Sequence, residues 1–89
     1  MNPRFVWPLA LLLVLASACR ISPQAKEQRF LKRGQAQMAK KDYARAVLEF
    51  RSAAQAVPSD PEPYYQWGLA SLAAGDGTTA IQAFRKTLS

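Results

Sequence analysis

The chain has 89 residues, of which 12 are Lys or Arg and 6 are Asp or Glu, with no His and a single Cys. This length allows at most one small domain. Because His is absent and Cys occurs once, the chain alone cannot supply the usual ligands of zinc or haem or form an internal disulfide. We therefore expect no metal and no cofactor. The formal net charge of +6 suits nucleic acid or an anionic membrane surface as a partner.

The N-terminal segment combines a short basic start, residues 1–4, with a continuous apolar run from Phe5 to Ala16. A helix that spans a membrane needs about 20 apolar residues, and this run ends sooner, before Ser17 and Cys19. A basic start, a short apolar core and small residues behind it are typical of a secretory signal peptide. The sequence therefore predicts that the chain is exported.

Two cleavage sites remain open, besides an anchor that is not cleaved. Ala16-Ser17-Ala18 fits an ordinary signal peptidase, which would leave a secreted or periplasmic soluble chain. With Leu15 before it and Cys19 after it, the same segment resembles a bacterial lipobox, whose cysteine carries a diacylglycerol. A lone thiol is a liability in an oxidising compartment, and acylation removes it. We therefore expect a lipoprotein signal peptide over 1–18 and a lipidated tether over 19–24.

Lipidation of Cys19 implies an anchor in the cell envelope, because several acyl chains, such as palmitate, hold a protein stably on a membrane. By resemblance to Gram-negative sorting rules, Arg20 after the cysteine favours the periplasmic face of the outer membrane. The basic residues gather near this end: Arg20, Lys26, Arg29, Lys32, Arg33, Lys40 and Lys41. They are expected to form a solvated face attracted to anionic headgroups. Nucleic acid is not expected, because the chain is exported and stacking aromatics do not alternate with the basic residues.

The rest of the chain matches itself when it is shifted by 34 residues. The matching pairs are Phe30 and Tyr64, Gly34 and Gly68, Asp42 and Asp76, Ala46 and Ala80, Val47 and Ile81, and Phe50 and Phe84. Several chemically equivalent pairs at one offset without gaps indicate an internal repeat, and such periods are typical of stacked repeat architectures.

The period and these residues resemble the tetratricopeptide repeat, a helix-turn-helix unit of 34 residues. The family's small, aromatic and proline positions fall on Phe30, Gly34, Ala46, Phe50, Ala53 and Pro58, and again on Tyr64, Gly68, Ala80 and Phe84. Arg33 stands where the family usually has Leu, and Gln37 and Ser71 where it has an aromatic. The resemblance implies an all-α fold, an α-solenoid of two helix-turn-helix units over residues 25–89. The first repeat covers about 27–60, and the second, incomplete, about 61–89.

Local patterns predict helices independently of this resemblance. Apolar residues spaced three or four apart, such as Tyr43, Val47 and Phe50, form one helical face, and Asp42 and Asp76 suit N-caps. The pattern predicts helices over 24–40, 42–57, 61–74 and 77–88. We expect the core to contain the aromatic residues Phe30, Phe50, Tyr64, Trp67 and Phe84. We expect the acidic residues to be solvated or to cap helices: Glu27, Glu49, Glu62, Asp42, Asp60 and Asp76.

The second repeat lacks a neighbour in this sequence. Stacked repeats usually need three or more units and a polar cap, and the outer face with Ile81, Phe84 and Leu88 would have no partner. We therefore expect the chain to be the N-terminal fragment of a longer array. The alternative is a small module completed by self-association.

The resemblance implies protein or peptide binding in a groove lined by the first helix of each repeat. Carried over by position, the groove residues are Gln28, Leu31, Lys32, Gln35 and Met38, and Glu62, Tyr65, Gln66, Leu69 and Leu72. No nucleophile–base pair, phosphate loop or catalytic carboxylate cluster stands out, so we expect no enzymatic activity.

The order of lipobox, tether and repeats resembles bacterial lipoproteins that act as envelope assembly scaffolds. Among these, the run from Phe30 through Ala53 resembles lipoproteins of the PEP-CTERM exopolysaccharide system. This implies a membrane-anchored scaffold that binds a protein of an exopolysaccharide, pilus or secretion machine. A self-associating structural anchor, or a secreted module without lipid, remains the alternative.

Overall fold

A computed structural model of the chain describes residues 20–89. The predicted signal peptide, its cleavage sites and Cys19 lie outside the described residues. Within this part of the chain there are four α-helices and no strand: α2 (Pro23–Ala39), α3 (Tyr43–Ala56), α4 (Pro61–Ala73) and α5 (Gly77–Leu88). The expected all-helical fold is confirmed for these residues. Each predicted helix differs from the observed one by no more than one residue at either end.

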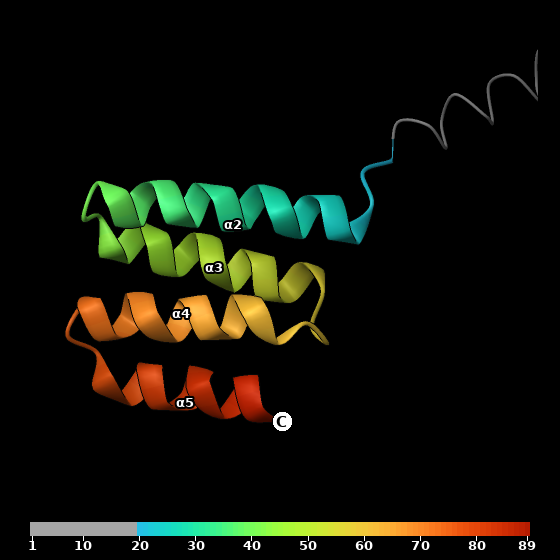
Figure 1. The fold of residues 1–89 in the computed structure, drawn as a ribbon. Coiled ribbons are helices and arrows are strands. Elements are labelled where there is room, and N and C mark those ends of the chain that lie inside the picture. Colours follow the sequence, from blue (N-terminus) through green and yellow to red (C-terminus); the bar gives the residue numbers. More distant parts are fainter. Residues whose placement is uncertain (1–19) are drawn as a thin grey trace, which may run out of the picture.

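The helices run antiparallel in chain order and lie side by side (Figure 1). α2 packs on α3, α3 on α4 and α4 on α5, and α2 also touches α4. The chain thus forms two helical hairpins, α2–α3 and α4–α5, and the second stacks on the first through α3 and α4.

A side-chain oxygen caps the N-terminus of every described helix. The oxygen accepts a hydrogen bond from a backbone N–H of the first turn, at distances of 3.0 to 3.3 Å. The caps are Ser22, Asp42, Asp60 and Asp76. Proline follows both Ser22 and Asp60, and its missing N–H costs nothing at the first helical position. These caps explain why the helices begin where the sequence pattern predicts.

The same turn closes both hairpins. Its central residue has a left-handed backbone, Lys41 with φ 60° and Gly75 with φ 83°. In the first turn, the N–H of Lys41 donates to the carbonyl of Met38 at 3.0 Å, and the N–H of Asp42 donates to the carbonyl of Gln37 at 2.9 Å. The second turn repeats both bonds at the same distances, from Gly75 to Leu72 and from Asp76 to Ser71. This pattern is the Schellman motif, which satisfies the last carbonyls of the first helix. Glycine adopts its left-handed conformation without strain, whereas lysine does not.

A glycine facing a phenylalanine sets the distance between the two helices of each hairpin. A Cβ atom on Gly34 would lie 2.6 Å from Cδ1 of Phe50, and one on Gly68 would lie 2.5 Å from Cδ1 of Phe84. Either contact is shorter than real Cβ atoms show. The phenylalanine ring therefore occupies the space that any side chain at the glycine would need.

The core lies where the two hairpins meet. It consists of the buried residues Leu31, Ala46, Phe50, Ala53 and Ala70, with Phe30, Met38, Val47 and Trp67 packed around them. Of the aromatic residues expected in the core, Phe50 is fully buried and the others are half-buried. The Tyr64 and Trp67 rings stack with centroids 6.3 Å apart. Small alanines let the helices approach, and the aromatics fill the remaining space.

The prediction that Glu27 is solvated or caps a helix is wrong. Its side chain is only 3% exposed. Oε1 accepts a weak hydrogen bond from Nε2 of Gln28 at 3.4 Å, and Oε2 has no partner within the described residues. Burial first, and then the neighbouring carboxyl group of Asp60, raise the pKa of Glu27 above its usual value. The tertiary structure causes this burial and this pKa, because the turn before α4 places Asp60 beside Glu27 on α2.

Candidate functional site

The predicted groove residues all lie on α2 and α4, the first helices of the two hairpins, and these helices touch each other. The structure exposes six of the ten side chains: Gln28, Lys32, Gln35, Glu62, Tyr65 and Leu72. Three are half-buried, namely Met38, Gln66 and Leu69. The remaining residue, Leu31, is buried.

Leu31 is therefore not part of the candidate surface, because its side chain is 6% exposed and belongs to the core with Ala46 and Phe50. It lies one helical turn before Gly34, which faces Phe50. Residues three apart share a helical face, so both positions point toward α3. A partner protein cannot reach Leu31 without opening the core.

The α4 part of this surface has an apolar stripe of Tyr65, Leu69 and Leu72. Their spacing of four and three residues puts them on one face of the helix. The Tyr65 ring contacts the Phe84 ring of α5, with centroids 6.1 Å apart and planes tilted by 43°. Tyr65 and Leu72 remain exposed. This stripe can bind the apolar face of a helix or the apolar side chains of an extended peptide.

A polar pair borders the stripe at the start of α4. Nε2 of Gln66 donates a hydrogen bond to Oε1 of Glu62 at 2.8 Å. The two residues are one helical turn apart, and such pairs stabilise a helix by about 0.2–0.5 kcal/mol. The bond brings the two side chains together beside Tyr65. They form a polar edge next to the apolar stripe.

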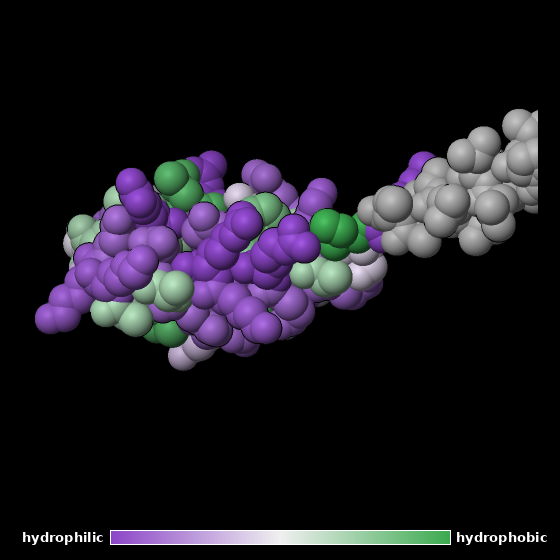
Figure 2. All heavy atoms as spheres, turned by 90° about the horizontal axis from the view of Figure 1, so that it is seen from above, coloured by the Kyte–Doolittle hydropathy of each residue, from purple (hydrophilic) through white to green (hydrophobic). Residues whose placement is uncertain are grey.

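The α2 part of the surface is basic. Its exposed charged side chains are Lys26, Arg29, Lys32 and Arg33, and its acidic residue, Glu27, is buried. Figure 2, viewed from above α2, shows mostly hydrophilic side chains over this face. The guanidinium carbon of Arg33 lies 5.8 Å from the centroid of the Phe30 ring. The solvent-facing charge of α2 is therefore entirely positive.

Sequence reasoning did not single out a contact between the two hairpins. The guanidinium carbon of Arg51 on α3 lies 5.5 Å from the centroid of the Trp67 ring on α4, a geometry that favours a cation–π interaction. A hollow of 390 Å³ opens beside them, and its lining also includes Tyr64 and Lys86. The repeat offset could have drawn attention to Arg51, because Arg51 and Arg85 occupy the same position in the two repeats.

Within residues 20–89, no group of three or more His, Cys, Asp or Glu side chains is placed to hold a metal ion. No helix in the same range has the length and apolar character needed to cross a membrane. Comparisons with protein-family models, with curated proteins and with solved structures found no match to this chain. A functional interpretation therefore depends on the surfaces of the two hairpins.

Proposed function

We propose that the chain is a tetratricopeptide-repeat lipoprotein that acts as a scaffold in a bacterial cell envelope. In this proposal Cys19 carries the lipid, and the hairpins bind a protein or peptide partner of an exopolysaccharide, pilus or secretion machine without catalysing a reaction. The main support is the equivalence of the two hairpins. They repeat the same caps, the same left-handed turn and the same glycine–phenylalanine contact at the sequence offset of 34 residues.

The proposed partner surface runs across α4 and α2. The stripe of Tyr65, Leu69 and Leu72 provides apolar contact, and an exposed Tyr that is already held by Phe84 costs little entropy to order. On α2, Gln35 offers an amide and Lys32 a positive charge. The complementary partner is a segment with apolar side chains for α4 and an acidic side chain for Lys32.

The proposed orientation on the membrane follows from the charge of α2. The tether leads directly into α2 at Pro23, so a lipid on Cys19 would keep this helix close to the bilayer. Basic side chains near an anionic surface contribute about 1 kcal/mol each. Lys26, Arg29 and Arg33, which are spaced three and four residues apart on one face of α2, would then lie toward the headgroups and leave Lys32, α4 and α5 available to the partner.

A self-associating structural anchor is the second candidate. Ile81 and Leu88 on α5 favour it, because both are large apolar side chains that remain more than half exposed. Exposed apolar residues that gather on one face commonly mark an interface. In this alternative, two copies of the chain would bury them against each other.

Site-specific photo-crosslinking in the producing bacterium tests the scaffold. A photoreactive phenylalanine analogue replaces Tyr65 or Leu72 in the full chain, and Leu48, an equally exposed residue on α3, is the control position. We expect the same envelope protein in adducts from both α4 positions, loss of the Tyr65 adduct in a Leu72→Asp background, and no such adduct from Leu48. Adducts that contain a second copy of the chain would support the structural anchor instead.

The lipid anchor has a separate test. The intact mass of detergent-extracted chain should correspond to residues from Cys19 onward plus acyl chains. A Cys19→Ser variant should leave the membrane fraction. An unmodified chain that begins at Cys19 would contradict the lipid anchor while leaving the partner surface untouched.

A further inference from the structure

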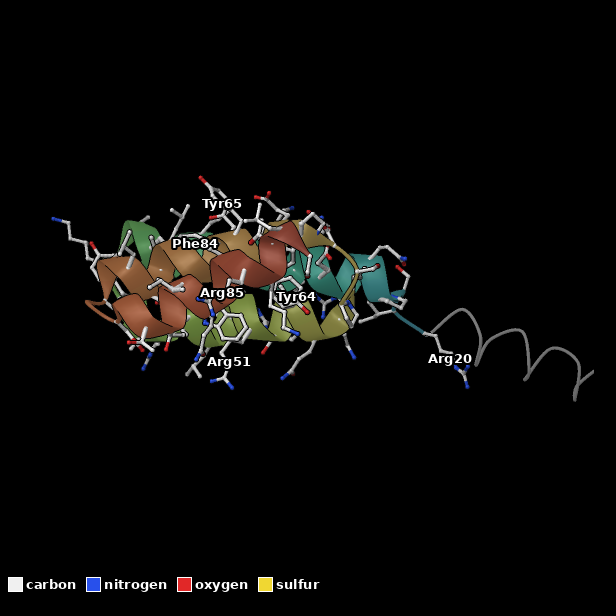
Figure 3. All side chains as sticks on the ribbon, turned by 90° about the horizontal axis from the view of Figure 1, so that it is seen from below. Arg20, Arg51, Tyr64, Tyr65, Phe84 and Arg85 are labelled. Carbon is white, nitrogen blue, oxygen red and sulfur yellow. The ribbon has the colours of Figure 1, made fainter. Side chains whose placement is uncertain are left out.

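The hollow of 390 Å³ at the contact between the two hairpins combines positive charge with aromatic surface. Its lining includes Arg51, Gln55, Tyr64, Trp67 and Lys86. Figure 3, seen from below, shows Arg51 directed toward one edge of the helices and Tyr65 toward the opposite edge. Arg51 and the proposed partner surface on α4 and α2 therefore lie on different sides of the molecule.

The hollow lies where α3 meets α4, and each of these helices has a neighbour on both sides. α2 and α4 flank α3, and α3 and α5 flank α4. Among the lining residues, Lys86 alone comes from α5. Its repeat equivalent on α3, Ser52, lines an open hollow of 260 Å³ although the α4–α5 hairpin stacks on α3. A further hairpin packed on α5 in the same manner would therefore leave Lys86 open too.

Neither cation of the hollow forms an ion pair within residues 20–89. The ion pair in this part of the chain joins Arg45 to Asp42 at 3.4 Å. An adjoining hollow of 290 Å³ shares Lys86 and contains Asp60, whose Oδ1 caps the N-terminus of α4. Arg51 and Lys86 therefore present two positive charges that no carboxylate of the described residues pairs with.

Arg51 can offer hydrogen bonds to a carboxylate while it contacts an aromatic ring. Its guanidinium carbon lies 5.5 Å from the centroid of the Trp67 ring, and an arginine that packs on a ring keeps N–H groups free to donate. Arginine fits a carboxylate with two parallel hydrogen bonds. The Tyr64 ring stacks on Trp67 with centroids 6.3 Å apart, and both residues are half-buried. Their exposed parts therefore give apolar surface next to the donors of Arg51.

We propose that this hollow binds an acidic side chain of an extended segment of a partner protein, with an apolar side chain next to it in that segment. The carboxylate accepts hydrogen bonds from Arg51 and pairs with Lys86, and the apolar neighbour covers the rings of Tyr64 and Trp67. Charge complementarity of this kind selects a partner. The site is distinct from the proposed α4–α2 partner surface, so one chain would hold two partner segments.

The row of hollows favours an extended segment as the occupant. The hollow shares Gln55 with the one of 260 Å³, and Tyr64 and Lys86 with the one of 290 Å³. A segment that places a carboxylate at Arg51 can therefore place neighbouring side chains in the adjoining hollows. Gln55 is exposed, and its amide can both donate to and accept from a peptide backbone.

Matched peptides test the charge and the apolar neighbour separately. The probes are the acetylated and amidated peptides Gly-Glu-Phe-Gly, Gly-Gln-Phe-Gly and Gly-Glu-Ala-Gly. Binding to the isotope-labelled full chain in detergent micelles is followed by the NMR signals of the Trp67 ring. Replacement of Glu by Gln should weaken binding at least about tenfold, because charged hydrogen bonds are lost. Replacement of Phe by Ala should weaken it about threefold to tenfold, because the contact with the two rings is lost.

Variants of the chain locate the contact. Arg51→Gln should weaken binding of the Glu-Phe peptide at least about tenfold and leave the weaker binding of the Gln-Phe peptide unchanged, since only a carboxylate needs the guanidinium. Arg51→Lys should have an intermediate effect, because it keeps the charge and loses the paired N–H groups. Lys86→Gln should weaken binding about twofold to fivefold, as expected for an exposed ion pair. Lys40→Gln removes an exposed charge at the other end of α2 and should have no effect.

Several outcomes would overturn the proposal. These are absence of binding of the Glu-Phe peptide, equal binding of the Glu-Phe and Gln-Phe peptides, or equal effects of Arg51→Gln and Lys40→Gln. Trp67 signals that respond to added phosphatidylglycerol and not to the peptides would assign the hollow to a lipid headgroup. Signals that shift with the concentration of the chain alone would assign it to a second copy. Crosslinking from Tyr65 and Leu72 tests the scaffold on other residues, so either proposal can fail without the other.

Discussion

The two hairpins share their local construction but differ in their surroundings. Phe50 and Phe84 occupy the same repeat position and face equivalent glycines. Phe50 is fully buried, because α3 lies between α2 and α4, whereas Phe84 is half-buried on α5. Identical local chemistry thus produces a core residue in one hairpin and a partly exposed residue in the other. The burial of a side chain here depends on whether a neighbouring helix follows.

The largest difference is expected from truncation of these two rings. Phe50→Ala should destabilise the chain by about 3–5 kcal/mol, since it opens a cavity in a buried site. Phe84→Ala should cost about 1–2 kcal/mol, because less apolar area is lost. Urea denaturation followed by circular dichroism measures both free energies of unfolding. Equal costs would contradict the view that α3 is central and α5 peripheral.

Substitution of Gly34 and Gly68, the glycines that face these two rings, also tests the difference between the two hairpins. Gly34→Ala should destabilise the chain by about 1–3 kcal/mol, because the buried Phe50 ring has no room to move. Gly68→Ala should cost less, since Phe84 can shift toward solvent. Gly77→Ala is the matched control, because a Cβ there meets nothing within 4 Å. Thermal unfolding measures both effects. A Gly68→Ala variant that unfolds at a lower temperature than the Gly34→Ala variant would contradict the expected order.

The buried carboxyl group of Glu27 distinguishes α2 from α4, whose acidic residue at the first turn, Glu62, is exposed. Because the folded-state pKa of Glu27 is raised, folding favours its protonated form, and stability falls as pH rises through that pKa. Glu27→Gln keeps the shape and removes the charge. We expect it to stabilise the chain by about 1 kcal/mol at neutral pH and by less in acid.

Denaturation of the wild type and the Glu27→Gln variant between about pH 5 and about pH 8 measures this difference. Asp76 does not disturb this comparison. The Thr79 side chain, followed by its backbone N–H, lowers the pKa of Asp76 by hydrogen bonding, so its contribution to stability is lost only in solutions more acidic than this range. A stabilisation independent of pH would show that the Glu27 charge is not the cause.

The smallest expected effect concerns the two left-handed turns. Lys41→Gly should stabilise the first turn by about 0.5–1 kcal/mol, since glycine adopts a positive φ without strain. Gly75→Lys should destabilise the second turn by a similar amount. The double variant, which exchanges the two turns, should then be close to the wild type. A thermal shift in the same direction for both single variants would contradict the equivalence of the turns.

The helices and their boundaries were predictable from the sequence because they depend on local chemistry. Asp42 and Asp76 cap the helices that follow them, and the pairing of Gly34 with Phe50 follows from the repeat pattern. The residues that the repeat resemblance predicts for a groove lie on α2 and α4, and six of the ten are exposed. Local spacing also identifies Tyr65, Leu69 and Leu72 as one stripe, and the structure adds the contact of Tyr65 with Phe84.

The burial of particular side chains was decided only by the tertiary structure. Leu31 was expected in a groove and Glu27 in solvent, yet both are buried, because neighbouring helices cover these positions. Arg51 and its equivalent Arg85 are both exposed, yet Arg51 contacts the Trp67 ring across the two hairpins. The sequence determined which residues form each helix and which face of the helix they share, since caps and periodicity act within a few residues. Which of those faces meets another helix is set by packing between segments distant in the chain, and no local pattern contains that information.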